Sequence, residues 1–429
     1  MRHSNRPQVR RALCALGTLF LLAGGTVAAA PVVLAGNSPG IVATWYDVGM
    51  LTINVPAAAT GTVAERRPVQ QADIATMHVA MYDAIVAITR THRPFAATTQ
   101  LPTAGASVDA AAIAAAYGVL QGLYPARTAQ YQSAYDEGLA RIADGDAKAR
   151  GVAIGRDIAA QVVAQRGDDG RLAPMAPYVP GTAPGQFRGT NPINAFLPST
   201  KPLAMTSAAQ FRAPGPTPLA SARYATDFDE TKALGGTVST ARTPQQAEAA
   251  RFHTEPPPTF LPRNLRKFAA SQPTLAENAR LAAAVWVTLS DATIACFESK
   301  YHYNFWRPLT AIPEAGNDGN DATAADPAWK PFVPTPNHPE YPAAHGCTAG
   351  ALAQTLRRHF GTGDVQFTLD STVTGTTRHY DTVDALTGEV TVARIAGGMH
   401  FRKSVEDGIV LGQAVADWVA DRNFQPTGP

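Results

Sequence analysis

Apolar residues recur at intervals of three and four along most of the chain, which is the spacing of one face of an α-helix. Such stripes occupy residues 74–88, 117–124, 131–142, 154–162 and 222–234. In each stripe the apolar side chains would cover one side of a helix and leave polar side chains on the other. The dominance of this period predicts an all-α fold.

The same periodicity continues in the C-terminal part of the chain. It predicts a long helix at about 273–306 and another at about 345–360. A last helix is expected at 405–421, with Ser404 as its N-cap. Residues 365–369 instead alternate between apolar and polar side chains, which predicts a short strand or hairpin.

One long segment, residues 168–220, breaks the helical pattern. It is rich in Pro, Gly, Ser and Thr and shows no sustained period. It is therefore either an ordered excursion over a helical core or a linker between two helical parts. Its large apolar side chains favour the excursion. On this basis the chain divides into an N-terminal helical half, 36–220, and a C-terminal helical bundle, 221–429.

Composition narrows the possible partners. Of 429 residues, 45% are hydrophobic and 16% are charged, and the formal net charge is +2. The chain is long enough for one large core or two modest ones. Nucleic acids and acidic membranes attract concentrated basic surfaces, and a nearly neutral, lightly charged chain gives no such signal. We therefore expect no nucleic-acid partner. The sequence predicts no particular oligomeric state.

The N-terminus has the pattern of an export signal over residues 1–35. A basic head precedes an apolar, Ala- and Leu-rich run at 12–30, and small residues near Ala35 offer a cleavage site. A membrane anchor is the alternative, because the run approaches the length of a spanning helix. We favour removal, which predicts an exported, periplasmic or extracellular protein that does not span the membrane.

Two cysteines follow the predicted signal. An even number of cysteines in an exported chain permits a disulfide between Cys296 and Cys347. Two small buried thiols are an equal alternative. The sequence leaves the choice open.

Three short segments carry the candidate chemistry. Lys300 precedes Arg307 by seven residues, which is about two helical turns, so both side chains are expected on one helix face near its end. His345 opens a predicted helix, whose N-terminus favours an anion. Arg394 precedes His400 by six residues, across a Gly-Gly pair. Guanidinium and ammonium groups are the donors that bind oxyanions such as phosphate and vanadate.

In order and spacing, these segments resemble the signature of the vanadium-dependent haloperoxidases and of the type 2 phosphatidic acid phosphatase superfamily to which they belong. Residues 80–84, 242–246, 338–342 and 398–402 are also similar to bacterial members. The resemblance extends over nearly the whole chain after residue 35. It implies two packed helical bundles, with the active site in the C-terminal bundle.

The resemblance also implies a vanadate cofactor and a role for each residue. His400 would be the axial ligand of vanadium, or the nucleophile toward phosphorus in a phosphatase. Lys300, Arg307 and Arg394 would neutralise the equatorial oxygens. His345 would be the general acid–base.

The sequence departs from the family pattern at two places. The family serine is Ala343 here, so one hydrogen bond to the oxyanion is lost, while the backbone N–H near Ala344 would still donate. The phosphatase pattern has an Asp where this chain has Ser404, and Glu406 or Asp407 could replace it. The missing Asp favours a peroxidase over a phosphatase.

The implied function is the oxidation of halide by hydrogen peroxide to hypohalous acid, which then reacts with a small organic substrate. His338 stands seven residues before His345, where this chain resembles algal bromoperoxidases, and this favours bromide or iodide over chloride. An ordinary loop histidine is the alternative. Two other functions remain open: an exported acid phosphatase with a phosphohistidine intermediate, and a non-catalytic or redirected descendant that binds oxyanions.

Overall fold

A long central helix, α9 (Leu275–Tyr303), organises the fold. The Thr274 side chain caps its start by accepting from the N–H of Glu277, and Asn304 ends it in the left-handed region at φ 50°, a conformation that asparagine tolerates better than most residues. The computed structural model describes residues 1, 31–34, 40–53, 70–171, 173–255 and 257–428. Residues 32–429 form one compact unit.

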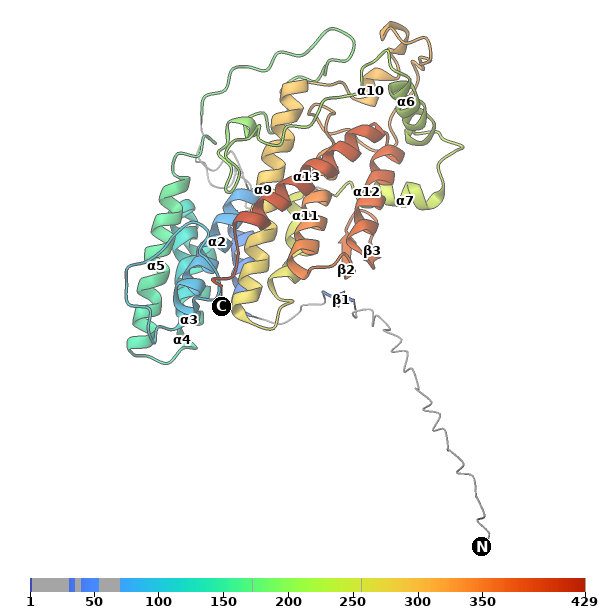
Figure 1. Ribbon diagram of the computed structural model, residues 1–429. Coiled ribbons are helices and arrows are strands. Elements are labelled where there is room, and N and C mark those ends of the chain that lie inside the picture. The colour runs from blue at the N-terminus through green and yellow to red at the C-terminus, as the bar shows by residue number, and fades with distance from the viewer. Residues whose placement is uncertain (2–30, 35–39, 54–69, 172, 256, 429) are drawn as a thin grey trace. The chain divides into compact units, whose positions relative to one another are not determined.

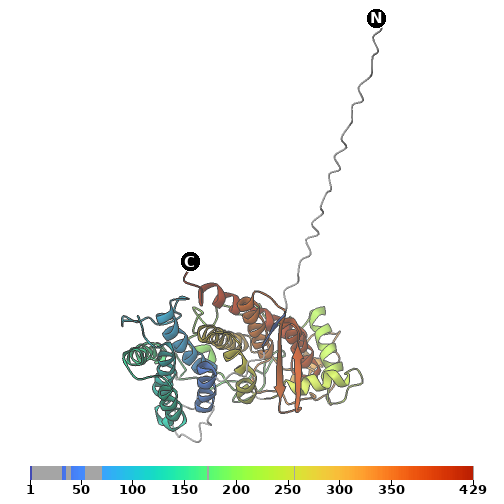
Figure 2. The same ribbon diagram turned by 90° about the horizontal axis from the view of Figure 1, so that it is seen from below.

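Five α-helices precede the non-helical segment in the described residues. They are α1 (Ile41–Ile53), α2 (Gln70–Thr89), α3 (Val108–Leu123), α4 (Thr128–Ala140) and α5 (Asp146–Arg166). Helix α2 packs against both α9 and α3, and α3 packs against α5. Figure 2 shows this blue-to-teal group to one side of the yellow α9.

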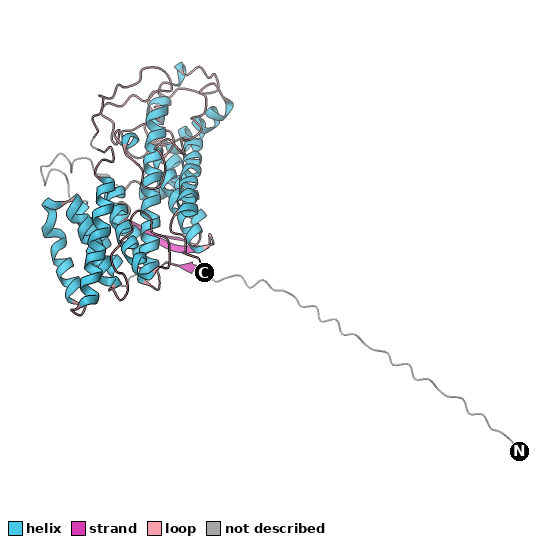
Figure 3. Ribbon diagram, turned by 60° about the vertical axis from the view of Figure 1, so that its left-hand side comes forward, coloured by secondary structure: helices cyan, strands magenta, loops and turns pink. Residues whose placement is uncertain are grey.

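The C-terminal helices gather on another side of α9. They are α6 (Ala222–Gly235), α7 (Pro244–Phe252), α8 (Pro257–Leu265), α10 (Pro308–Ala311), α11 (Ala344–Phe360), α12 (Val383–Ala396) and α13 (Arg402–Arg422). Helices α11 and α13 both pack against α9 and against each other. The all-α prediction is confirmed by thirteen α-helices in the described residues (Figure 3).

Helices α11 and α13 approach so closely because glycines line their contact. A Cβ added at Gly350 would lie 2.3 Å from the carbonyl oxygen of Ile409, and one at Gly412 would lie 2.1 Å from that of Cys347. Side chains of any size would separate the two backbones. This contact fixes the start of α11, where His345 lies.

A small sheet completes the fold. Its strands are β1 (Val32–Val33), β2 (Val365–Ser371) and β3 (Thr376–Tyr380), with β2 in the centre. Strands β2 and β3 form an antiparallel hairpin, and alternate side chains of β2 are buried. The predicted strand or hairpin at 365–369 is therefore confirmed.

The predicted export signal falls largely outside the described residues. Within its range, Val32 and Val33 pair in parallel with Val365 and Gln366. Removal of the chain through Ala35 would take β1 with it. The signal stays a prediction.

Residues 173–220 form an ordered excursion that arches over one end of α9 (Figure 1). The carboxylate of Asp291, fully buried in α9, accepts hydrogen bonds from the N–H groups of Leu203, Ala204 and Met205 at 2.7–2.8 Å. Phe187 donates its N–H to the carbonyl of Asn304 at 2.9 Å. The excursion thus packs on the helix end that carries Lys300.

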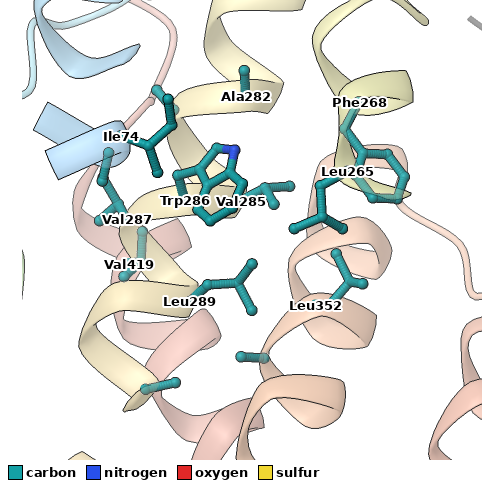
Figure 4. Close-up of a cluster of buried hydrophobic side chains, with 14 of the residues drawn as sticks. Ile74, Leu265, Phe268, Ala282, Val285, Trp286, Val287, Leu289, Leu352 and Val419 are labelled. Atoms are coloured by element: carbon teal, nitrogen blue, oxygen red, sulfur yellow. The ribbon is translucent and has the colours of Figure 1, made fainter. Parts of the chain in front are cut away.

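The hydrophobic core surrounds the middle of α9. Figure 4 shows Trp286, Val285 and Leu289 of α9 among Leu352 of α11 and Phe268. Helices α2 and α9 are long and apolar enough to cross a membrane, but 83% and 94% of their most apolar windows are buried within the protein. Their apolar surfaces are therefore used in packing.

One predicted helix start is wrong. Helix α13 begins at Arg402 with Phe401 as its N-cap residue, three residues before the predicted start at 405. The N–H of Phe401 donates to a buried carboxylate oxygen of Glu340 at 3.1 Å. This tertiary hydrogen bond stabilises the earlier start, so Ser404 lies inside the helix.

Candidate oxyanion-binding site

Three basic side chains predicted to act together are all buried in one region. Lys300 is 0% exposed, Arg394 1% and Arg307 2%. Lys300 lies in the last turn of α9, Arg307 directly before α10, and Arg394 in the last turn of α12. The Nζ of Lys300 donates to the carbonyls of Pro339 and Glu340, both at 2.9 Å.

The two arginines meet at Met399. Arg307 donates from Nη1 to the Met399 carbonyl at 2.9 Å, and Arg394 contacts the Met399 sulfur through Nη2. Arg307 also donates from Nε to the carbonyl of His338 at 2.9 Å. The structure therefore brings all three cations together around the segment 338–340 and the loop before His400.

The route by which Lys300 and Arg307 converge differs from the predicted one. They were expected on one face of a continuous helix, but α9 ends at Tyr303 and the left-handed Asn304 turns the chain. Arg307 then precedes α10 in an extended conformation at φ −86°, ψ 156°. A reversal of the chain, rather than helical spacing, brings the two residues together.

The carboxylate of Glu340 acts to raise the pKa of Lys300 and Arg307, but one carboxylate compensates the charge of three cations only in part. None of them forms a salt bridge with a carboxylate in the described part of the chain. Burial, and then the neighbouring Arg307, lower the pKa of Lys300 well below its usual value. Burial lowers the pKa of Arg307 to about 10, and burial with Arg307 nearby lowers that of Arg394 to about 9. Buried positive charge that is only partly compensated is costly, and an anion bound among these groups would offset that cost.

His400 presents one ring nitrogen to this cationic region. Its Nδ1 lies 2.8 Å from Oε1 of Glu340, and its Nε2 lies 2.9 Å from Nη1 of Arg307. A guanidinium can only donate, so Nε2 is the acceptor and the proton resides on Nδ1, which donates to Glu340. The geometry therefore fixes the tautomer of His400 with the Nε2 lone pair directed toward Arg307.

Glu340 is the site residue that the sequence analysis missed. Its side chain is 0% exposed, and Oε2 has no hydrogen-bond partner among the described residues. Burial raises its pKa to about 7, although Arg307 and Lys300 oppose the shift. The sequence does offer one signal that could have identified it: Glu340 is the one acidic residue in the Pro-rich loop 331–343.

The phosphatase Asp would orient the imidazole of His400. Glu406 and Asp407, which could have replaced it here, have other partners. Glu406 pairs with Arg223, and the Asp407 carboxylate accepts from Tyr341 and Lys403. The Ser404 hydroxyl lies 3.5 Å from the carbonyl of Glu340 and does not contact the ring of His400. Glu340, which lies in a different segment of the chain, is therefore the residue that orients the ring of His400.

His345 has a free imidazole at the start of α11. Its side chain is partly exposed and forms no hydrogen bond with any of the described residues. Burial lowers its pKa well below the usual value, with further lowering from Arg394, His253, Lys300 and Arg307. The imidazole is therefore neutral at neutral pH and can accept a proton.

The first turn of α11 offers unpaired backbone donors. Ala343 is fully buried and gives no side-chain cap, and its N–H donates to the carbonyl of Ser404 at 2.9 Å. The N–H groups of Ala344 and the next two residues have no acceptor among the described residues. Such donors, with the helix dipole, favour an anion.

The imidazole of His338 contacts the guanidinium of Arg307. Its Nδ1 lies 3.0 Å from Nη2 of Arg307, and its ring centroid is 5.1 Å from that of Phe297. The side chain is 6% exposed. His338 is thus in the site and in contact with one of its cations.

Cys296 and Cys347 form a disulfide, which resolves the alternative that the sequence left open. Cys296 lies one turn before Lys300 in α9, and Cys347 lies two residues after His345 in α11. The bond therefore ties together the two helices that carry these site residues.

The donors present suit a tetrahedral oxyanion better than a divalent cation. No group of three or more His, Cys, Asp or Glu side chains in the described residues is arranged to hold a metal ion. The Nε of Arg394 is buried with no hydrogen-bond partner among those residues. With this N–H, the spare donor of Lys300 and the first turn of α11, the site fits a vanadate or phosphate ion.

Part of the chain matches a known protein family. Residues 280–427 match the family model of the second helical-bundle domain of VCPO. The vanadium chloroperoxidase of Curvularia inaequalis is 30% identical over 126 residues, which cover 24% of this chain and 20% of that protein. The chain thus matches about a fifth of the length of this curated relative.

Solved structures are similar in fold to this chain over a much larger part of its length than the curated relative matches. The structure of the first bacterial vanadium-dependent iodoperoxidase is similar with a TM-score of 0.72 and 21% identity, covering 92% of this chain and all of that one. A bacterial vanadium-dependent chloroperoxidase in its holo form has a TM-score of 0.66 and 17% identity, covering 86% and 94%. Residues 280–427 thus belong with the second helical-bundle domain of VCPO, and the chain has the fold of these bacterial vanadium-dependent peroxidases.

Proposed function

We propose that the protein binds vanadate and oxidises halide with hydrogen peroxide to hypohalous acid, which then reacts with a small organic substrate. One observation carries the proposal: Lys300, Arg307 and Arg394 are buried in one region without a salt bridge among the described residues, and the unprotonated Nε2 of His400 is directed at Arg307. A cationic cluster alone would serve any oxyanion. A fixed imidazole lone pair adds a ligand for an oxyanion whose central atom accepts a fifth donor, as vanadium does.

Each residue has a role that follows from its place. His400 would hold vanadate through Nε2, with Glu340 holding its ring. Lys300, Arg307 and Arg394 would bind the oxygens that carry negative charge. Backbone carbonyls already hold Lys300, Arg307 and Arg394 in place. Arg307 would have to release Nε2 of His400, which it contacts at 2.9 Å, for that nitrogen to act as a ligand.

Vanadate would supply a Lewis-acidic centre that polarises peroxide without a change in its own oxidation state. His345 would remove a proton from the incoming peroxide. Its imidazole is neutral because burial and nearby cations lower its pKa, and no described residue occupies its ring nitrogens by hydrogen bonding. An anion bound among the cations would offset the charges that lower the pKa of His345, and this would make its unengaged imidazole a better general base.

The decisive experiment is a vanadate titration of purified apoprotein, with peroxide-dependent bromination of a dye as the readout. Activity should rise with vanadate and saturate, and His400→Ala should abolish it. Hydrolysis of a phosphomonoester is measured in parallel. Hydrolysis that vanadate inhibits, without halide oxidation, would establish the phosphatase alternative; bromination independent of vanadate and of His400 would refute the proposal.

For the halide, we propose bromide or iodide over chloride. Support comes from His338, whose imidazole lies beside Arg307 and contacts Phe297, and from the similarity to a structure described as an iodoperoxidase. Initial rates with the three halides in wild type and in His338→Phe measure this directly. A preference for chloride in the wild type would contradict it.

We also propose that the protein is exported. The Cys296–Cys347 disulfide supports this, because such bonds persist mainly in oxidising compartments. Cell fractionation followed by N-terminal sequencing of the processed chain tests the location, and it shows whether cleavage precedes or follows Val32. Retention of the unprocessed chain in the cytoplasm would be the contrary result.

A further inference from the structure

Met399 places a thioether sulfur among the groups of the candidate site. Its side chain is 2% exposed, and its sulfur accepts from Nη2 of Arg394. Its backbone carbonyl accepts from Arg307, and the next residue in the chain is His400. Gly398, at φ +74°, turns the chain into this position. Filling a gap in the core is the ordinary use of methionine, but this sulfur contacts a functional cation.

Oxidation converts a thioether into a sulfoxide, which is a polar group, and leaves the backbone intact. We propose that Met399 is an oxidation site, and that its sulfoxide weakens oxyanion binding by engaging Arg394. The inference rests on the proposed function, which would supply the oxidant next to the sulfur.

The reaction balances without another reagent. The sulfur lone pair attacks the halogen of hypohalous acid, hydroxide leaves, and water then adds to sulfur as halide departs. The net change is thioether plus hypohalous acid to sulfoxide, halide and a proton. Sulfur loses two electrons and the halogen gains two. Hydrogen peroxide gives the same sulfoxide, with water as the by-product.

The effect on the site follows from the Arg394 contacts. Its Nη1 donates to the carbonyl of His253 at 3.0 Å, its Nη2 contacts the Met399 sulfur, and its Nε has no partner among the described residues. A thioether is a weak acceptor, so Arg394 remains available to an oxyanion. A sulfoxide oxygen is a strong acceptor and would hold the guanidinium. The enzyme would thus lose affinity for vanadate in proportion to its own turnover, and methionine sulfoxide reductase would restore it.

Other methionines of the chain provide internal references. Met175 is 44% exposed and reports oxidation from bulk solvent, while Met205 is 6% exposed and matches Met399 in burial. During peroxide-dependent bromide turnover, peptide mass spectrometry should find sulfoxide at Met399 before Met175. Added hypobromous acid should give the reverse order. Vanadate affinity, measured by equilibrium dialysis, should fall at least about tenfold in the protein oxidised at Met399.

Two variants complete the test. Met399→Leu keeps the backbone carbonyl that Arg307 uses, and it should sustain several-fold more turnovers before activity decays. Met205→Leu is the matched control and should decay like the wild type. The proposal is overturned if Met399 stays reduced while Met175 is fully oxidised during turnover, or if the Met399 sulfoxide binds vanadate as tightly as the native protein.

A failure of the proposed function would look different. In that case no methionine oxidises in a turnover-dependent manner, and dye bromination is absent. Added hypobromous acid, at a dose that oxidises Met205, still tests the site: it should oxidise Met399 and weaken phosphate binding at least about tenfold. If phosphate affinity is unchanged in that sample, the role of Met399 is refuted independently of catalysis.

Discussion

The contact between Glu340 and His400 gives the sharpest test of the site. Glu340→Ala removes the acceptor that lies 2.8 Å from Nδ1 of His400, and the same oxygen accepts the N–H of Phe401 at 3.1 Å. A buried hydrogen bond to a charged group contributes about 1.5–3 kcal/mol. If the Nδ1–H tautomer depends on it, vanadate should bind roughly ten- to hundred-fold more weakly.

Removal of the carboxylate also has an opposite effect. Glu340 is negatively charged when ionised and lies close to the anion site, so its loss favours an anion electrostatically. At an effective dielectric constant of about 20 and roughly 7 Å, that gain is on the order of 2 kcal/mol. The two effects are similar in size, and a single variant would not separate them.

A matched pair of variants does separate them. Glu340→Gln removes the same charge as Glu340→Ala but keeps an oxygen that can accept from Nδ1. The ratio of vanadate affinities between the two therefore reports the hydrogen bond alone. We expect the alanine variant to bind vanadate at least about tenfold more weakly than the glutamine variant, since an unsatisfied buried donor costs about 1–3 kcal/mol.

Phosphate is the control ligand. Phosphate in its ground state remains tetrahedral and uses the three cations without a bond to Nε2, so the two variants should bind it equally. Equilibrium dialysis with both anions, with circular dichroism to confirm folding, provides the measurements. Equal vanadate affinities in the alanine and glutamine variants would refute the argument that Glu340 fixes the His400 tautomer.

Further predictions concern other parts of the site and its support. Ala343→Ser should strengthen vanadate binding by roughly ten- to hundred-fold by restoring a hydroxyl donor, as measured by dialysis. Replacement of Cys296 and Cys347 by alanine should lower the unfolding free energy by about 4 kcal/mol in urea titrations, because the disulfide spans 51 residues. Asp291→Asn should cost about 2–4 kcal/mol in the same assay, since an amide oxygen cannot satisfy all three N–H groups of the excursion. In apoprotein, His345 should titrate below 6.5 by NMR, and phosphate should raise its pKa because the anion offsets the cations that lower it; an unchanged titration would contradict this electrostatic account.

Several features of the fold follow from local sequence alone. The apolar stripes give the positions of the helices. A helix buries one face, so apolar side chains recur every three or four residues along the sequence. The alternation at 365–369 likewise gives the position of β2. The identities and order of Lys300, Arg307 and Arg394 indicate an oxyanion site without knowledge of the fold.

The sequence by itself thus determined the helical class and the hairpin, and it singled out the basic side chains of the candidate site. Tertiary structure decided the end of α9 at Asn304, the pairing of Cys296 with Cys347, and the choice of Glu340 as the partner of His400. Periodicity and capping act within a few residues, so they can be read along the chain. Contacts between residues 51 or 60 positions apart depend on how helices pack, and the same local sequence is compatible with many such packings.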